Sequence, residues 1–303
     1  MKKMENKKIV VAGLINIETT QAIGKFPIEY NPIDYTFFGT ESTVSGVGFN
    51  VAKALKCLGS DVSLLSLIGK DMYKECIYAE LEKSGIKKDG IKESLKEIPQ
   101  SIVLYDSEGK RKIYLDLKDI QDMSYEVSDE QNPFEGAEIA VICNINFARS
   151  LFDSAKKAAK KIATDVHVVC DIHDDFNKQF MESSDILFMS NEAILGREEQ
   201  FVKEVASAYD NEIIVVGMGS EGALLYQKED KSITMVKAVH TRDIVSTIGA
   251  GDALFSAFIH FYSKGVTAKE ALQRAVYFAS YKIGEKGAAC GFISEEKLLE
   301  LYK

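Results

Sequence analysis

The chain alternates short apolar runs with segments of helical periodicity, and this alternation restricts the possible fold more than any other feature. The runs are rich in Val, Ile and Leu, which is typical of strands buried on both faces of a sheet. Between them, apolar residues at i, i+3, i+4 and i+7 indicate helices that connect successive strands. Such a succession predicts an α/β fold, a doubly wound and mostly parallel sheet flanked by helices. The expected strands are residues 9–14, 62–69, 138–143, 166–171, 185–189 and 212–216, and the expected helices are residues 50–58, 151–162, 250–264 and 267–286.

Two segments, at about 17–40 and 98–118, interrupt this alternation and have no crossover helix of their own. The first has alternating apolar positions, and the second has the pattern of a hairpin that turns at residues 107–109. Antiparallel strands inserted in an α/β domain most simply form a small sheet that stands off the main body. We therefore expect one domain, residues 1–303, with a small β-sheet lid assembled from both segments.

Charge and cysteine content exclude several classes of protein. The chain has 37 Lys and Arg residues against 46 Asp and Glu residues, a net charge of −9. A general nucleic-acid binder needs a basic face, so no nucleic-acid partner is expected. The five cysteines lack any C-x-x-C spacing, which favours reduced thiols in a cytoplasmic protein. The first apolar run is too short for a signal peptide or a membrane span, so no membrane partner is expected.

The segment at residues 249–252 (Gly-Ala-Gly-Asp) stands directly before an apolar helix. Free backbone N–H groups and the helix dipole at such a place favour an anion. A carboxylate beside them would repel a phosphate, unless Asp252 accepts a proton from a hydroxyl that attacks a phosphoryl group. The alternative is a plain turn followed by an acid that stabilises the first helical turn. The spacing alone leaves both interpretations open.

This segment resembles the second signature of the ribokinase-like (PfkB) carbohydrate kinase family. Residues 45–52 (Ser-Gly-Val-Gly-Phe-Asn-Val-Ala) resemble its first signature, and residues 65–71 partly match its Leu-x-Gly-x-x-Gly-x-Asp element. The resemblance extends from Ile9 to about Ile293. It implies a ribokinase-like fold and the transfer of the γ-phosphoryl group of ATP to a primary hydroxyl.

The resemblance implies roles for the residues that match these motifs. Asp252 is expected to be the catalytic base, beside an anion hole made by the backbone of residues 249–251. Glycines of the first signature are expected to approach the sugar closely, and Asn50 to bind it through its amide. Glu18 replaces the family's usual aspartate. The expected catalytic residues are Asp252, Gly249, Ala250 and Gly251, and the expected substrate-binding residues are Asn16, Glu18, Gly46, Val47, Gly48 and Asn50.

On the nucleotide side, residues 218–222 resemble the family's nucleotide-binding turn, and residues 287–289 resemble the small-residue turn beside the adenine. Asn191 matches the asparagine of an Asn-x-x-Glu element that orders water around magnesium. Ile194 replaces the glutamate of that element, and Glu192 is the nearest acid. The expected nucleotide-binding residues are Asn191, Gly219, Ser220, Gly222 and Gly287, and those expected to contact a metal indirectly, through water, are Asn191 and Glu192.

The resemblance implies ATP and Mg²⁺ as cofactors, and it raises a monovalent cation, K⁺, as a third. Ser246 stands where the family commonly has an aspartate, so the presence of a K⁺ site is left open. The family's Asp-x-Asn element is matched to residues 171–173 (Asp-Ile-His). Lid sheets of this family often pair between subunits, so a homodimer through the lid is an open expectation.

Three functions remain compatible with the sequence. The first is an ATP-dependent kinase of an unphosphorylated sugar. The second is a nucleoside kinase, favoured by the apolar Val47 and by Phe37 and Phe38, whose rings can stack on a base. The third is a non-catalytic sugar or nucleotide sensor.

A site rich in amides and carboxylates and poor in arginine favours a neutral polyhydroxyl acceptor, because a phosphate needs a cationic clamp. Asn144 and Asn146 follow a sheet strand and are counted with this site. Arg111 and Lys112, on the lid hairpin, oppose this interpretation if they reach over the site.

Overall fold

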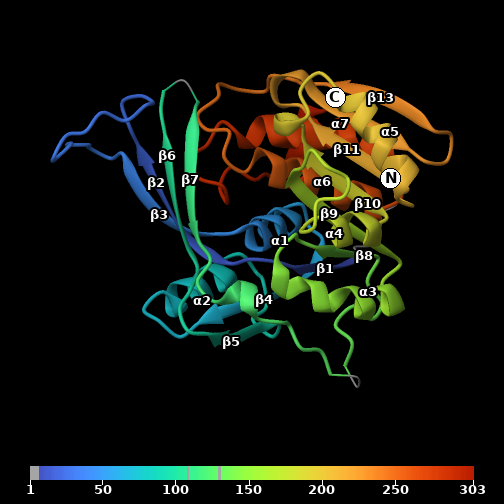
Figure 1. The fold of residues 1–303 in the computed structure, drawn as a ribbon, viewed down its shortest axis with the longest axis horizontal. Coiled ribbons are helices and arrows are strands. Elements are labelled where there is room, and N and C mark those ends of the chain that lie inside the picture. Colours follow the sequence, from blue (N-terminus) through green and yellow to red (C-terminus); the bar gives the residue numbers. More distant parts are fainter. Residues whose placement is uncertain (1–6, 108, 129–130) are drawn as a thin grey trace.

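The computed structural model describes residues 7–107, 109–128 and 131–303. Over these residues, nine strands form the main sheet in the order β13-β12-β11-β10-β9-β8-β1-β4-β5 (Figure 1). All neighbours from β11 to β5 pair in parallel, while β12 and β13 continue the sheet in antiparallel pairing. These strands are β1 (Lys8–Ala12), β4 (Asp61–Gly69), β5 (Ile91–Leu95), β8 (Ile139–Ile142), β9 (Lys161–Val168), β10 (Ile186–Ser190), β11 (Ile213–Gly217), β12 (Gly222–Gln227) and β13 (Ser232–Lys237).

Helices cover both faces of this sheet, which explains why its central strands, such as β1, β8, β10 and β11, are mainly apolar. In β1, Ile9 and Val11 face one half of the core and Val10 and Ala12 face the other, and all four side chains are fully buried. One face is covered by α1 (Val47–Cys57), α2 (Lys74–Lys83), α6 (Ala250–Ser263), α7 (Ala268–Lys282) and α8 (Glu295–Leu301). The other is covered by α3 (Phe152–Ala158), α4 (Lys178–Ser183) and α5 (Glu198–Ala208). The short 3₁₀ helices are η1 (Ile120–Asp122), η2 (Asn146–Leu151), η3 (Asn191–Ala193) and η4 (Gly219–Glu221). The doubly wound α/β architecture is therefore confirmed.

A second, smaller sheet stands beside the main body, and Figure 1 shows it with β7 next to β6. Its order is β3-β2-β6-β7, with β2 and β6 parallel and the other pairs antiparallel. The expected second sheet, drawn from two distant parts of the sequence, is thus present. Its strands are β2 (Asn16–Ala22), β3 (Thr40–Ser45), β6 (Gln100–Tyr105) and β7 (Arg111–Asp116).

Several expected boundaries differ from the structure. The first lid segment was expected to end near residue 40, but β3 begins at Thr40, and residues 23–39 form a connection without strands. The hairpin between β6 and β7 was expected to turn at residues 107–109, of which Glu108 lies outside the described residues. The last long helix ends at Lys282 rather than at residue 286.

The largest error concerns the strand expected at 166–171. The helix before it ends at Ala158, and β9 already begins at Lys161, because Ile162 and Ala163 pair with β8 and are buried. The expected helix over 151–162 was therefore too long, and the strand was placed too late. None of the helices within the described ranges is long and apolar enough to cross a membrane.

Candidate active site

Polar residues gather where parallel strands of the main sheet end. Asn16 follows β1, His167 lies at the end of β9, Asn191 follows β10, and Gly219 follows β11. Carboxyl ends of parallel strands share one edge of a sheet, and ligands of open α/β sheets bind there. The helices α1 and α6, which pack against each other, add their amino-terminal residues near this edge.

Two glycines of the first signature allow the start of α1 to pack closely against the turn after β1. Gly46 has a φ of 101°, and a Cβ atom on it would lie 2.5 Å from the carbonyl oxygen of Leu14. A Cβ atom on Gly48 would lie 2.4 Å from the carbonyl carbon of Gly13. Both positions therefore need glycine because the backbone of the chain itself lies close to them, and their contact with a sugar stays a prediction. Val47 between them is half-buried and packs against the core.

The segment Gly249–Gly251 forms a tight entry into α6. Gly249 has a φ of 76°, and a Cβ atom on it would lie 2.6 Å from the carbonyl oxygen of Ala288. A Cβ atom on Gly251 would meet nothing within 4 Å, so this side of the backbone is open to a ligand. The N–H of Ala250 donates to the carbonyl of Thr247 at 3.2 Å, whereas those of Gly251 and Asp252 lie in the first helical turn, which lacks intrahelical acceptors.

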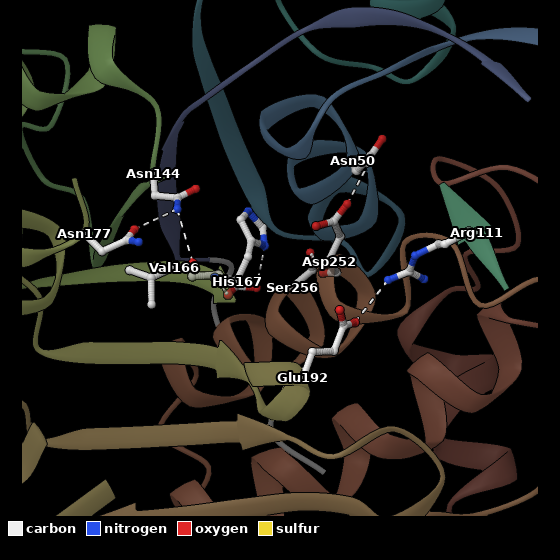
Figure 2. A network of polar contacts seen from close by, with 10 residues as sticks. Asn50, Arg111, Asn144, Val166, His167, Asn177, Glu192, Asp252 and Ser256 are labelled. Carbon is white, nitrogen blue, oxygen red and sulfur yellow. Dashed lines mark hydrogen bonds and ion pairs between the residues drawn. The ribbon is translucent and has the colours of Figure 1, made fainter. Parts of the chain in front are cut away.

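Asp252 is held at the start of α6 by a contact between the two signatures. The amide of Asn50 donates to Oδ2 of Asp252 at 2.8 Å (Figure 2). The hydroxyl of Ser45 donates to Oδ1 of Asn50 at 3.3 Å. Ser256 donates to the backbone carbonyl of Asp252 at 2.5 Å. Burial raises the pKa of Asp252, against opposing effects of His167 and Asn50. The amide of Asn50 therefore binds the aspartate, and its expected contact with a sugar stays a prediction.

Asn16 and Glu18 on β2 present acceptor atoms that lack partners. Asn16 donates its amide to the hydroxyl of Ser101 at 2.9 Å, but its buried Oδ1 accepts no hydrogen bond among the described residues. Oε1 of Glu18 is buried and equally unpartnered within that part of the chain. Burial raises the pKa of Glu18, although hydrogen bonding to the Ala288 backbone opposes this, and Asp252 lies near enough to raise it further. Buried acceptors without donors point to a ligand rich in hydroxyl groups.

Asp165 and His167, a pair at the end of β9, were not among the expected site residues. His167 has a φ of 57°, and its Nδ1 lies 3.7 Å from Oδ2 of Asp165. Figure 2 shows His167 between Asn144 and Asp252, and its charge acts on the pKa of Asp252. The pattern Asp165-x-His167 is the signal that reveals this pair once β9 is placed correctly. By contrast His173, from the segment matched to the family's Asp-x-Asn element, lies beside Lys178, Glu182 and Tyr209.

Arg111 crosses from the small sheet to the loops of the main body. Its Nη2 lies 3.4 Å from Oε1 of Glu192 (Figure 2). Its Nη1 lies 3.5 Å from the hydroxyl of Thr247, two residues before Gly249. Lys112 instead stacks over Tyr114 on the same strand, 4.9 Å from the ring centre. The contact of Arg111 with Glu192 balances charge at the edge of the site.

Asn191 has a different carboxylate partner from the one expected. Its amide donates to Oε1 of Glu198 at 3.0 Å, and this bond lowers the pKa of Glu198. Glu192, the neighbour considered as a substitute for the missing glutamate, is exposed and pairs with Arg111. The acid that contacts Asn191 therefore stands at the first position of α5, beyond the four-residue motif.

The expected nucleotide turn follows β11 as η4. Gly219 and Ser220 are exposed there, and a Cβ atom on Gly219 would meet nothing within 4 Å. Gly222 has a φ of 114°, and a Cβ atom on it would lie 2.0 Å from the carbonyl oxygen of Val236, so this glycine is required by strand packing. Gly287 has a φ of 77° and accepts a hydrogen bond from Lys282 through its carbonyl.

Some residues counted with the site bind elsewhere. Asn144 donates to the Val166 carbonyl and to Asn177, and Asn146 contacts Gln121 and Arg149. Phe37 and Phe38, expected to stack on a base, are 86% and 100% exposed on the connection between β2 and β3. These two pairs therefore give no support to acceptor binding.

Comparison with known proteins agrees with this geometry. Residues 6–294 match the model of the family described as pfkB family carbohydrate kinase. A 5-dehydro-2-deoxygluconokinase of Clostridium beijerinckii is 24% identical over 91% of this chain and 92% of its own length. An ATP-dependent ribose-1-phosphate kinase of Halopiger xanaduensis is 23% identical over 93% of both chains. The structure of a microbiome-derived acarbose kinase, Mak1, superposes with a TM-score of 0.86 at 22% identity, over 98% of this chain and 99% of that one, which shows a common fold.

Proposed function

The chain belongs to the pfkB family of carbohydrate kinases, and from this premise we propose that it transfers the γ-phosphoryl group of ATP to the primary hydroxyl of an unphosphorylated sugar. Kinases of this family are phosphotransferases that act on hydroxyl groups. The acceptor class, the residue roles and the metal are our inference from the site.

Asp252 acts as the general base. Its carboxylate is oriented by Asn50 at 2.8 Å and lies beside the open backbone of Gly251. Burial raises its pKa, which makes the carboxylate a stronger base than an exposed aspartate. As the acceptor hydroxyl attacks the γ-phosphorus, its proton passes to a carboxylate oxygen of Asp252, and the bond from phosphorus to the bridging oxygen of ADP breaks.

The backbone at the start of α6 stabilises the charge that develops in this step. The N–H groups of Gly251 and Asp252 and the positive end of the helix dipole face the transferred phosphoryl group. Because Gly251 has no side chain and open space around it, the phosphoryl oxygens can approach the backbone closely. Gly249 holds the turn in the left-handed conformation that directs these N–H groups.

The proposed class of substrate is based on the unpartnered acceptor atoms of Asn16 and Glu18. Both oxygens are buried and need donors, which the hydroxyls of a neutral sugar supply and a phosphate dianion does not. The lid arginine, Arg111, already pairs with Glu192 and Thr247. These contacts favour an unphosphorylated acceptor over a sugar phosphate.

Magnesium fits the nucleotide side of the site. This ion is commonly held by one or two carboxylates together with substrate phosphates and water. Glu192 offers an exposed carboxylate beside Thr247 and Arg111, and Asn191 precedes it. We place Mg²⁺ with the phosphates of ATP beside these residues, which would contact the ion through water while Glu192 keeps its pair with Arg111, and the ion would neutralise phosphate charge.

The small sheet closes over the acceptor as a lid, and its outer face is a candidate surface for a second copy of the chain. Ile102 and Tyr114 are cross-strand neighbours there and are 49% and 50% exposed. Sedimentation velocity on the wild type and on Ile102→Glu distinguishes a dimer through this face from a monomer.

An acceptor screen tests the proposed function. ATP consumption is measured with Mg²⁺ over pentoses, hexoses, oligosaccharides, nucleosides and the corresponding sugar phosphates. We expect turnover with one or more neutral sugars, and the product should carry phosphate on its primary hydroxyl. Preferential turnover of fructose 6-phosphate or another sugar phosphate would contradict the proposed acceptor class. Preferential turnover of nucleosides would show that the chain is a nucleoside kinase instead.

A further inference from the structure

Lys282, the last residue of α7, has a completely buried side chain. Its ammonium group donates to two backbone carbonyls, that of Ile248 and that of Gly287, the latter at 2.8 Å. Burial of a charged lysine is costly, and the buried lysines of proteins are normally paired with a carboxylate. The buried ammonium of Lys282 instead donates its hydrogen bonds to carbonyl oxygens, which is an unusual arrangement and suggests a function for the charge.

One carbonyl belongs to the segment that leads into the proposed anion hole, and the other belongs to the segment that packs against it. Ile248 directly precedes Gly249, the residue from which α6 begins. Gly287 directly precedes Ala288, whose carbonyl oxygen limits the space beside Gly249. Ala288 also packs with Ile248 and with Val103 of the lid. A cation between these carbonyls joins both segments at the place where the phosphoryl group is expected.

A buried cation surrounded by backbone carbonyls has the chemistry of a monovalent metal site, in which carbonyl oxygens replace the hydration shell. The K⁺ site that the sequence raised at Ser246 does not fit this arrangement. Ser246 provides no carboxylate, and the neighbouring carbonyl of Ile248 already accepts from Lys282. A K⁺ ion placed at the Ile248 carbonyl would lie against the ammonium and be repelled by it.

We propose that Lys282 is a built-in monovalent cation that positions the anion-hole loops, so that phosphoryl transfer by this chain does not depend on K⁺. The proposal rests on the proposed kinase function and assigns Lys282 as a positioning residue. It acts through the backbone of residues 248–251 and not by contact with substrate.

The charges around Lys282 agree with this role. Burial lowers the pKa of its ammonium to about 8, and the nearby groups that favour the charged form are Asp252 on α6, Glu18 on β2, and Cys290 and Glu285 beyond α7. The ammonium is therefore charged at neutral pH and loses its proton as the pH rises through about 8. The loops are then expected to lose their fixed cation, and activity and ATP affinity fall on the alkaline side.

The test compares the wild type with Lys282→Ala and Lys282→Met in K⁺-free buffer at constant ionic strength. Each protein is assayed with added K⁺, NH₄⁺ or n-propylammonium, both by steady-state turnover and by calorimetric titration with ATP. We expect wild-type values that do not change with K⁺. Lys282→Ala should lose about 10–100-fold in kcat, the usual cost of removing a positioning partner. K⁺ or n-propylammonium should restore part of this loss because the truncated side chain leaves room for the ion.

Two controls separate a positioning role from general damage. Lys282→Met fills the same space without charge, so added cations should not restore it. Lys264 is a second buried lysine, paired with Glu295 at the far end of α6, and Lys264→Ala should respond to no added cation. Thermal denaturation of each variant shows whether it folds.

Each outcome decides the proposal. Stimulation of the wild type by K⁺, or a Lys282→Ala variant with wild-type kcat and ATP affinity in K⁺-free buffer, overturns it. If Lys282→Ala does not fold, two measurements on the wild type still test the proposal. Activity that does not change with K⁺, together with ATP affinity that falls above about pH 8, supports it, and the opposite result for either measurement overturns it. If the wild type consumes ATP with no acceptor, the proposed function fails. The cation dependence of ATP binding then tests the role of Lys282 independently.

Discussion

The amide of Asn50, in the first turn of α1, donates a 2.8 Å hydrogen bond to the carboxylate of Asp252 in α6, across 202 positions of the sequence. Each residue belongs to a different signature, so this bond joins the acceptor side of the site to the phosphoryl side. The bond also lowers the pKa of Asp252 against the rise caused by burial. Base strength and base orientation therefore depend on the same contact.

Replacing Asn50 by alanine should change the pH profile as well as the rate. Without the amide, the pKa of Asp252 rises, so the acid limb of kcat/KM moves to higher pH. Loss of a hydrogen bond to a charged group costs about 1.5–3 kcal/mol, or roughly tenfold or more in kcat/KM. Asn132→Ala, whose amide binds Ser154 instead, is the control and should keep the wild-type profile. An unchanged acid limb in Asn50→Ala would contradict the role of this bond.

Asp252→Asn should abolish turnover while ATP still binds. The amide has the shape of the carboxylate but cannot accept the hydroxyl proton, and loss of a general base typically costs about 10²–10⁴-fold. Turnover is measured with the acceptor found in the screen, and ATP binding by calorimetry. A variant with near-normal kcat would exclude Asp252 as the base.

The small sheet should respond to the acceptor as one unit. Its two halves are joined by the parallel pairing of β2 and β6, and Val103 packs on Ile248 and Ala288 of the main body. Addition of the acceptor should slow hydrogen exchange in β2, β3, β6 and β7 together, measured by mass spectrometry. The edge strand β5 of the main sheet serves as the reference and should not change. Slower exchange in only one half would show that the halves move separately.

Gly48→Ala should destabilise the fold. Its Cβ atom would lie 2.4 Å from backbone of Gly13, which cannot move aside as a flexible side chain can. Overpacking of this kind costs about 1–3 kcal/mol in the free energy of unfolding, measured by denaturant titration. Gly24→Ala is the matched control, because its Cβ atom would meet nothing within 4 Å, and it should change stability by less than about 0.5 kcal/mol. Equal stability of both variants would refute the packing role.

Glu295→Gln should lose stability in a pH-dependent way. Nε2 of His260 lies 3.6 Å from Oε2 of Glu295, and Lys264 donates a hydrogen bond to the same oxygen at 2.7 Å. Interaction with His260 and then with Lys264 lowers the pKa of Glu295 from 4.5 to about 2. Because the folded pKa lies below the unfolded one, the stabilisation is present above about pH 4.5 and is lost as the pH falls towards 2. The wild type should therefore be more stable than the variant at pH 6, and the difference should shrink on acidification. Denaturant titrations at several pH values measure this, and a difference that is constant with pH would argue against it.

Local patterns were sufficient for most of the central strands and for the glycine-rich motifs beside them. The buried strands were recognisable because both faces of β1 are covered, which requires apolar residues without interruption. Residues 249–252 were recognisable because the glycines, the helix start and the acid are neighbours in the chain. The start of β9 was misplaced because its register depends on pairing with β8, which no local pattern records. The same error hid Asp165 and His167.

The sequence by itself therefore determined the succession of the central strands and helices and the position of the glycine turn before α6, since both depend on near neighbours. The tertiary structure decided how the polar groups are used. It directs Asn50 to Asp252, Asn191 to Glu198, and Lys282 to the carbonyls of Ile248 and Gly287. Lys282 follows Ala271, Ala275 and Phe278 on the buried stripe of α7, which was a readable signal of burial. Its partners were not readable, because a hydrogen bond is selected by the distance between atoms after the chain has packed.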